Sequence, residues 1–141
     1  MKIKLLFLSV ILVAADQIAK NIFLTSFCNQ NLAWRISITP AIFYSAWIII
    51  VAFLIYLFTN TRNYYQKFFL VLVFSGAVSN LIDRIRFGCV VDYIDFKIFP
   101  VFNLADVYIT IGAILFLFSF LKPNDKIQMT NQAQRSKSKK I

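Results

Sequence analysis

Four long apolar segments constrain the fold of this chain more than any other feature of its sequence. They cover approximately residues 3–24, 41–58, 67–86 and 104–121, and each is close to the roughly 20 residues that a helix needs to cross a bilayer core. The chain is 60% hydrophobic and 15% charged, so it has too few polar residues to cover a water-soluble core of this size. We therefore expect an all-α transmembrane protein, in which residues 1–121 form one four-helix membrane bundle.

The basic residues are divided unevenly between the two ends of such a bundle. With four spans, both termini share one side of the membrane with the loop between the second and third spans. That side carries the whole net charge of +9, while five basic and five acidic residues balance on the other side. The positive-inside rule thus predicts cytoplasmic termini and acidic residues at the outer face. Because basic and aromatic residues do not alternate along one face, we expect no binding of nucleic acid.

The segments outside the spans have their own patterns. Residues 31–39, "NLAWRISIT", alternate apolar and polar positions, which predicts a small amphipathic β-like platform at the outer interface. Residues 122–141 are polar and basic, which is typical of a disordered cytoplasmic tail. The segment "MKIKLLFLSVILVAA" resembles a cleavable signal peptide. Apolar residues resume after Asp16, however, and extend this segment to spanning length, so we expect it to stay as the first helix.

The sequence does not determine whether the two cysteines are free thiols or form a disulfide. Cys28 and Cys89 form no C-x-x-C motif, and the chain has no histidine, so we expect neither a zinc site nor another cofactor. The pair is compatible with two free thiols and with one disulfide.

The aspartates lie close to the apolar segments, where a charge is costly. An acid at the centre of a spanning helix costs about 2.5–3.5 kcal/mol on insertion scales. Asp16 and Lys20 have i, i+4 spacing and suit a local ion pair as well as a functional site. Asp83 is best explained by pairing with a basic residue such as Arg84, and Asp95 by a solvated surface position.

Asp92 and Asp106 are candidates for a catalytic pair. Asp106 follows Asn103, a suitable N-cap, and would occupy the first turn of the fourth helix, where the helix dipole favours a carboxylate. A loop that returns from the third span to the fourth would bring Asp92 to the same place. Two carboxylates about 4 Å apart repel by roughly 4 kcal/mol, or about 3 pKa units, so one of them would keep its proton. This is the chemistry of an aspartic protease, which needs no serine, histidine or metal.

Five segments in this order resemble the sequence blocks of lipoprotein signal peptidase, also called signal peptidase II. They are "DQIAK" at 16–20, "NQNLAW" at 29–34, "GAVSNLIDR" at 76–84, "VVDYIDF" at 90–96 and "FNLAD" at 102–106. The resemblance implies an aspartic endopeptidase of the bacterial cytoplasmic (inner) membrane. It would remove the signal peptide from a diacylglyceryl-modified prolipoprotein, cutting just before the lipidated cysteine.

The resemblance also implies roles for individual residues. Asp92 and Asp106 match the catalytic pair, and Asp83 matches an acid that supports the site. The positions implied near the substrate are Asn29, Asn80, Arg84, Asn103, Asp16 and Lys20. The segment 31–39 matches the family's outer platform. The chain departs from the pattern at Asn31, Arg35, Ser75 and Ser79, and in a short loop between the two catalytic positions.

The expected partners are a lipid-modified prolipoprotein and membrane lipid, and the expected state is a monomer. Two other classes of function fit some of the same residues. In a transporter or channel subunit, Asp16, Asp92 and Asp106 would relay protons or bind cations. In a non-catalytic assembly factor, the polar residues would only hold helices together.

Overall fold

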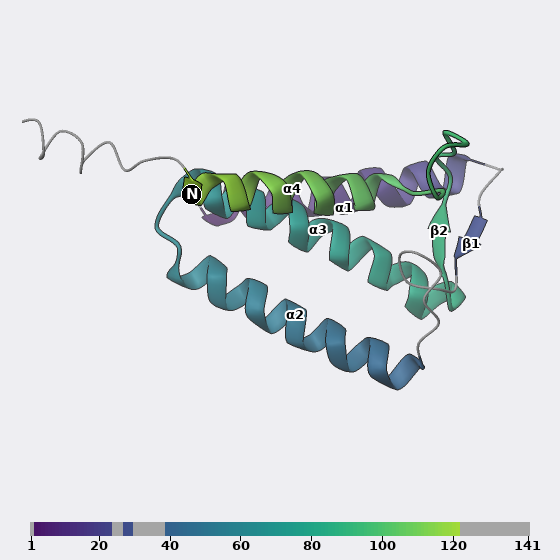
Figure 1. Ribbon diagram of the computed structural model, residues 1–141, viewed down its shortest axis with the longest axis horizontal. Coiled ribbons are helices and arrows are strands. Elements are labelled where there is room, and N and C mark those ends of the chain that lie inside the picture. Colours follow the sequence, from purple (N-terminus) through teal and green to yellow (C-terminus); the bar gives the residue numbers. More distant parts are fainter. Residues whose placement is uncertain (1, 24–26, 30–38, 122–141) are drawn as a thin grey trace, which may run out of the picture.

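The computed structural model describes residues 2–23, 27–29 and 39–121. In chain order, the elements are α1 (Lys2–Ile22), β1 (Phe27–Asn29), α2 (Pro40–Asn60), α3 (Tyr64–Phe87), β2 (Val90–Asp92) and α4 (Leu104–Leu121). All four helices are long and apolar enough to cross a membrane. The predicted four-helix membrane fold is therefore confirmed (Figure 1).

The helix boundaries differ slightly from the predicted spans, except for α4, which has the predicted limits. α1 ends at Ile22, and α2 extends from Pro40 to Asn60. α3 begins three residues before the predicted span because Asn63 is its N-cap, whose side chain accepts a hydrogen bond from Tyr65 N at 2.9 Å. α3 ends at Phe87 and is followed by the C-cap Gly88, whose φ of 72° lies in the left-handed region that glycine adopts without strain.

α3 is the central helix of the bundle. It packs along α4 and α1, whereas α2 leans away from the other helices at one end (Figure 1). Gly76 and Gly112 allow the closest approach of α3 and α4, since a Cβ at either position would meet backbone of the opposite helix. At the other end of α2, Leu54 packs with Leu70 and Phe116 in a buried apolar cluster.

β1 and β2 form a two-stranded antiparallel sheet at the end of the bundle where α3 ends and α4 begins. We call this the strand end of the bundle (Figure 1). Most of the predicted platform at residues 31–39 lies outside the described residues, which exclude 31–38. Its last residue, Thr39, is the N-cap of α2. The predicted tail at 122–141 also lies outside the described residues.

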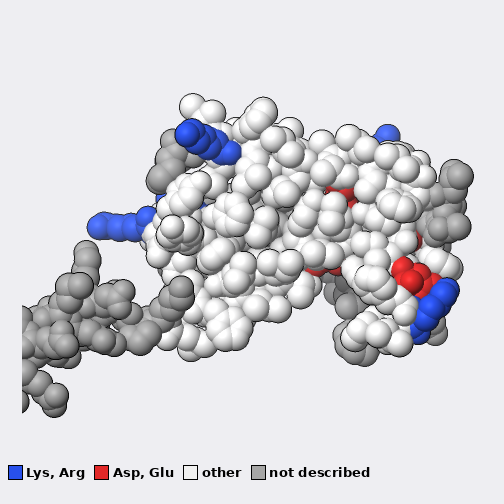
Figure 2. All heavy atoms as spheres, turned by 90° about the horizontal axis from the view of Figure 1, so that it is seen from above, with Lys and Arg blue, Asp and Glu red and all other residues white. Residues whose placement is uncertain are grey.

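The outer surfaces of the helices carry many exposed large hydrophobic side chains. In Figure 2, Lys and Arg lie toward the two ends of the molecule, and uncharged residues cover most of the surface between them. This distribution suits helices whose outer faces contact lipid and whose ends reach the headgroups.

Candidate active site

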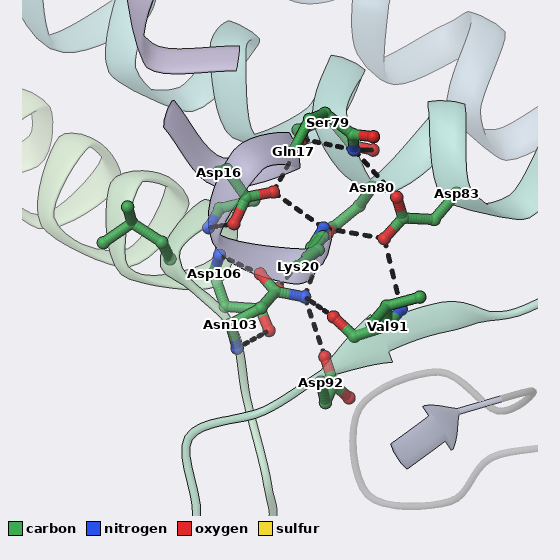
Figure 3. A network of polar contacts seen from close by, with 12 residues as sticks. Asp16, Gln17, Lys20, Ser79, Asn80, Asp83, Val91, Asp92, Asn103 and Asp106 are labelled. Atoms are coloured by element: carbon green, nitrogen blue, oxygen red, sulfur yellow. Dashed lines mark hydrogen bonds and ion pairs between the residues drawn. The ribbon is translucent and has the colours of Figure 1, made fainter. Parts of the chain in front are cut away.

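The strand end of the bundle contains a buried cluster of polar side chains (Figure 3). Among the buried polar residues are four charged ones, which are Asp16, Lys20, Asp83 and Asp92. Within the described part of the chain, every buried side-chain nitrogen and oxygen has a hydrogen-bond partner. A fully paired network is the condition under which an apolar bundle tolerates so many polar groups.

Lys20 is the cation at the centre of this network. Its Nζ lies 2.7 Å from Asp16 Oδ2 and 2.7 Å from Asp83 Oδ2, and it donates to Asn80 Oδ1 at 3.0 Å. The ammonium group has three protons to donate, so these three partners use its full capacity. The expected ion pair between Asp16 and Lys20 is present, and Asp83 pairs with Lys20, not with Arg84 as expected.

Asp16 and Asp83 connect separate elements through their remaining contacts. Asp16 accepts hydrogen bonds from Ser79 Oγ at 2.6 Å and from Ala105 N at 3.0 Å, which joins α1 to α3 and to the start of α4. Asp83 accepts from Gln17 Nε2 at 2.8 Å and from the backbone N–H of β2 at 3.1 Å. Both oxygens of each carboxylate are thus used to join separate elements, which supports a structural role for both aspartates.

Asp92 is the last residue of β2 and is 3% exposed. Its Oδ1 accepts from Asn103 Nδ2 at 2.7 Å, and its Oδ2 accepts from Asn29 Nδ2 at 3.0 Å. Each carboxylate oxygen therefore has an amide donor, one from the start of α4 and one from β1. These donors hold the carboxylate in a fixed orientation.

Asp106 lies in the first turn of α4, as predicted, and shares a partner with Asp92. Its Oδ1 accepts from Asn80 Nδ2 at 2.8 Å, and its Oδ2 accepts from Asn103 N at 3.2 Å. The backbone N–H of Asp106 in turn donates to Asn103 Oδ1 at 2.9 Å, so Asn103 caps the helix. The two aspartates thus bond to the same asparagine (Figure 3).

The partners of Asn80 determine how its amide group is oriented. Its Oδ1 accepts from Lys20 Nζ at 3.0 Å and from Asn103 Nδ2 at 3.1 Å. Because the oxygen faces two donors, the nitrogen must face Asp106, to which it donates. Lys20 therefore reaches Asp106 through Asn80.

The surroundings of Asp92 shift its acid–base equilibrium. The pKa of Asp92 is raised to about 6, mainly by burial and also by the nearby charge of Asp106. The hydrogen bonds from Asn29 and Asn103 and the positive charge of Lys20 lower it, since they stabilise the ionised form. A carboxyl group with this pKa can hold or release a proton close to neutral pH.

The structure brings most of the predicted site residues together. Asn29, Asn80 and Asn103 all contact one or both members of the Asp92–Asp106 pair. Arg84 lies with its guanidinium 4.4 Å from the centre of the Phe43 ring, which places it between α3 and α2. Asp95 lies near the surface, as expected, and the structure adds an ion pair with Lys97 that was not predicted.

Sequence reasoning missed three residues of the network. Gln17 donates to Ser79 and Asp83, and Ser79 donates to Asp16. Tyr93 OH accepts from Leu104 N at 3.3 Å and thus reaches the first residue of α4. In the sequence, Ser79 stands out only as a departure from the family pattern. Its i, i+4 spacing to Asp83 is the one signal that both side chains face the same neighbouring helix.

The state of the cysteines is settled by the structure. Cys28 and Cys89 form a disulfide with a Cα–Cα distance of 5.5 Å. Among the described residues, no group of histidine, cysteine and acidic side chains is arranged to hold a metal ion.

Comparison with known proteins gives a consistent match. A family model described as signal peptidase (SPase) II matches residues 8–122. The lipoprotein signal peptidase of Halothermothrix orenii is 40% identical over 114 residues, which are 78% of this chain and 77% of that protein. The Staphylococcus aureus protein of the same name is 42% identical over 106 residues, or 70% of this chain and 65% of the relative. The Caldicellulosiruptor bescii protein is 53% identical over 76 residues. These residues are 53% of this chain and about half, 50%, of that relative.

Solved structures show the same architecture. Two structures of a bacterial membrane enzyme, determined by the in meso method at 2.3 Å and 1.9 Å resolution, each have a TM-score of 0.77 and 33% identity to this chain. The first match covers 84% of this chain and 87% of the other, and the second covers 86% and 94%. Since the family model spans most of the sequence and the helices superpose on solved structures, this chain belongs to the signal peptidase II family.

Proposed function

We propose that this protein is an aspartic endopeptidase that cleaves the signal peptide from diacylglyceryl-modified prolipoproteins, just before the lipidated cysteine. Membership of the signal peptidase II family supports cleavage of signal peptides, and the relatives carry the name lipoprotein signal peptidase. One observation carries the aspartic mechanism. Asp92 and Asp106 come from separate elements and bond to the same asparagine, Asn103.

The pair supplies both the acid and the base of the reaction. One carboxyl group keeps a proton while the other is ionised. The ionised group takes a proton from water as the water oxygen attacks the scissile carbonyl carbon, and the protonated group gives its proton to the carbonyl oxygen. The tetrahedral intermediate then collapses, the C–N bond breaks, and a proton passes to the leaving amine. The raised pKa of Asp92 suits this exchange at neutral pH.

The other predicted site residues have supporting roles in this proposal. Asn29, Asn80 and Asn103 orient the carboxylates, and Arg84, which packs on Phe43 at the α2–α3 interface, has the proposed role of binding a peptide carbonyl. Asp16 and Lys20 are buried among protein atoms. We therefore assign them to positioning of the site and no longer to direct substrate contact.

The proposed location is the bacterial inner membrane, with both termini in the cytoplasm and the strand end at the outer face. The distribution of basic residues supports this orientation. A substrate anchored by its diacylglycerol group stays in the bilayer, so a site at the ends of the helices meets both the peptide and water. We propose that the protein acts as a monomer surrounded by lipid, and the dyad mechanism needs no cofactor.

The test is cleavage of a diacylglyceryl-modified prolipoprotein by the full chain in detergent. The variants are Asp92→Asn and Asp106→Asn, and Asp95→Asn is the matched control because Asp95 is only partly buried and pairs with Lys97, outside the buried network. We expect wild type and the control to release a product whose first residue is the lipidated cysteine, identified by mass spectrometry. The two dyad variants should lose about 10²–10⁴-fold in rate.

Two results would contradict the proposal. A folded Asp92→Asn or Asp106→Asn protein that cleaves at the wild-type rate would exclude the dyad. Wild-type protein that leaves the substrate intact but dissipates a proton gradient in liposomes would identify a transport protein instead.

A further inference from the structure

β1 is held beside β2 by little backbone structure. Each strand has three residues, and the pairs are Phe27 with Asp92, Cys28 with Val91 and Asn29 with Val90. A two-stranded sheet of this size is marginally stable by itself. The Cys28–Cys89 disulfide joins the two segments across 61 positions of sequence. It is the covalent connection that fixes β1 beside β2.

The disulfide and the contact with Asp92 lie on opposite faces of this sheet. Side chains alternate along a strand, so Cys28 and Asn29 face opposite ways. Residues paired across the strands share a face, so Asn29 faces the same way as Val90 and Asp92, and its Nδ2 donates to Asp92 Oδ2 at 3.0 Å. A slip of one residue would turn Asn29 to the other face. The disulfide, on the opposite face of the sheet, prevents such a slip because it links the two strands covalently.

We propose that the Cys28–Cys89 disulfide positions Asn29 against Asp92, and that reduction of this disulfide lowers the activity of the enzyme. The inference rests on the proposed function, because it concerns the same active site. It makes the two cysteines positioning residues, which act through Asn29 and do not touch the substrate.

Release of Asn29 has a specific electrostatic consequence. The hydrogen bond from Asn29 stabilises the ionised form of Asp92 and lowers its pKa, against the effect of burial. The charged groups that face Asp92 from the helices are Lys20 on α1, Arg84 on α3 and Asp106 on α4. Reduction leaves these groups in place. Loss of Asn29 alone should therefore raise the pKa of Asp92.

The disulfide is placed so that a thiol reductant can reach it. Cys28 is exposed, Cys89 is 2% exposed, and both line a cavity of about 370 Å³ together with Arg86. A thiolate from a dithiol attacks the sulfur of Cys28, and Cys89 leaves as a thiolate and takes up a proton. The second thiol of the reagent then displaces Cys28. The protein gains two electrons and two protons as two thiols, and the dithiol becomes a disulfide.

The experiment compares oxidised and dithiothreitol-reduced full-length protein in lipid nanodiscs. The kcat and KM for a diacylglyceryl-modified prolipoprotein peptide are measured across pH for wild type, Asn29→Ala and the double variant Cys28→Ser/Cys89→Ser. Reduction should lower the wild-type kcat about tenfold and move the pH-profile pKa assigned to Asp92 upward by about one unit, the effect of one charged hydrogen bond. Asn29→Ala should show the same shift when oxidised, and reduction should add nothing to it.

The double variant is the control for the reagent, because dithiothreitol should leave its kinetics unchanged. If reduction lowers only the melting temperature, with kcat and the pH profile unchanged, the disulfide is merely structural and the inference is wrong. The inference is equally wrong if reduction lowers the kcat of Asn29→Ala by the same factor as that of wild type, because the disulfide would then act independently of Asn29. Reduction of purified wild type gives this answer even if the serine variants fail to fold.

Failure of the proposed function would look different. In that case the oxidised wild type would leave the substrate uncut. The coupling would then be read from the pH dependence of the melting temperature of wild type relative to Asp92→Asn, which reports the pKa of Asp92 without any substrate. An unchanged dependence after reduction would overturn the inference.

Discussion

Asn103 donates a hydrogen bond from its side-chain nitrogen to Oδ1 of Asp92 at 2.7 Å. The same residue is fully buried, precedes α4, and caps that helix by accepting from the N–H of Asp106. The N-cap residue of α4 therefore also connects this helix to the end of β2. Helix capping and alignment of the two aspartates depend on one side chain.

This double role predicts the effect of Asn103→Ala. The variant removes the donor to Asp92, and a hydrogen bond to a charged group contributes about 1.5–3 kcal/mol. We expect kcat to fall about 10- to 100-fold, and the free energy of unfolding to fall by about 1 kcal/mol from loss of the cap. Asn63→Ala is the matched control, because Asn63 caps α3 far from the site. The control should lose similar stability and keep its kcat; an equal loss of kcat in both would contradict the role of Asn103.

The second prediction concerns the buried cation. Lys20→Met leaves Asp16 and Asp83 without their shared cation, and breaking a buried ion pair in this way costs about 3–5 kcal/mol. We expect a large fall in melting temperature in detergent. Lys97→Met removes a lysine whose side chain is 84% exposed, and should cost less than about 1 kcal/mol. Addition of Asp83→Asn to Lys20→Met should restore part of the lost stability, whereas a further loss would show that the unpaired charge is not the cause.

The third prediction follows from the raised pKa of Asp92. Its value of about 6 in the folded protein lies above the usual value of about 3.9 for an unfolded chain. Between these pH values the unfolded chain releases a proton that the folded protein keeps, so wild type loses stability as the pH rises from about 4 to about 6. Asp92→Asn has no such group. Its melting temperature relative to wild type should rise across this window and level off above it.

Asp95→Asn provides the opposite sign for the same experiment. The hydrogen bonds from Lys97 lower the pKa of Asp95, so the small stability that this group contributes is present above its usual pKa and is lost as the pH falls. The melting temperature of Asp95→Asn relative to wild type should therefore not rise between pH 4 and 6. The same trend in both variants would mean that the titration does not belong to Asp92.

The parts of the fold that were predictable are those set by local pattern. Length and hydropathy alone define helices that cross a bilayer, which is why α4 has the predicted limits. The start of α3 lies earlier than the hydropathy pattern predicts, because the first turn of the helix is less apolar than the rest and the capping side chain of Asn63 lies outside that pattern. The expectation that Asp106 lies in the first turn after an N-cap came from local spacing, and the structure has that arrangement.

The contacts that were not predictable join residues far apart in the chain. Lys20 and Asp83 meet because α1 packs against α3, and no spacing in the sequence reveals the relative rotation of two helices. The same packing explains why Gln17 and Ser79 were missed. Pairing of Cys28 with Cys89 depends on the register of two short strands. Local sequence patterns thus identify the individual polar residues of the site, whereas tertiary packing determines which of them pair with each other.

The last prediction tests whether the fit of α3 against α4 sets the geometry of the dyad. A Cβ at Gly76 would clash with the carbonyl oxygen of Ala105 and lie 2.7 Å from Ile109 Cγ1. Gly76→Ala should therefore push the start of α4 away from α3, at a cost of about 1–3 kcal/mol. Asp106 directly follows Ala105, so its 2.8 Å contact with Asn80 should lengthen. A displacement of 1 Å can reduce a rate about 100-fold, and we expect a loss of this size in kcat.

Gly112→Ala separates this local effect from general loosening of the bundle. Its Cβ would lie 2.7 Å from the carbonyl oxygen of Phe69 and 2.9 Å from Val73 Cγ2, in the same helix interface but away from the strand end. Both variants should melt at lower temperature than wild type in detergent. Only Gly76→Ala should lose kcat in the fraction that remains folded, because only that substitution moves the turn that carries Asp106. Equal kcat in the two variants would mean that the dyad is held by its asparagine contacts alone and tolerates a shift of the helix behind it.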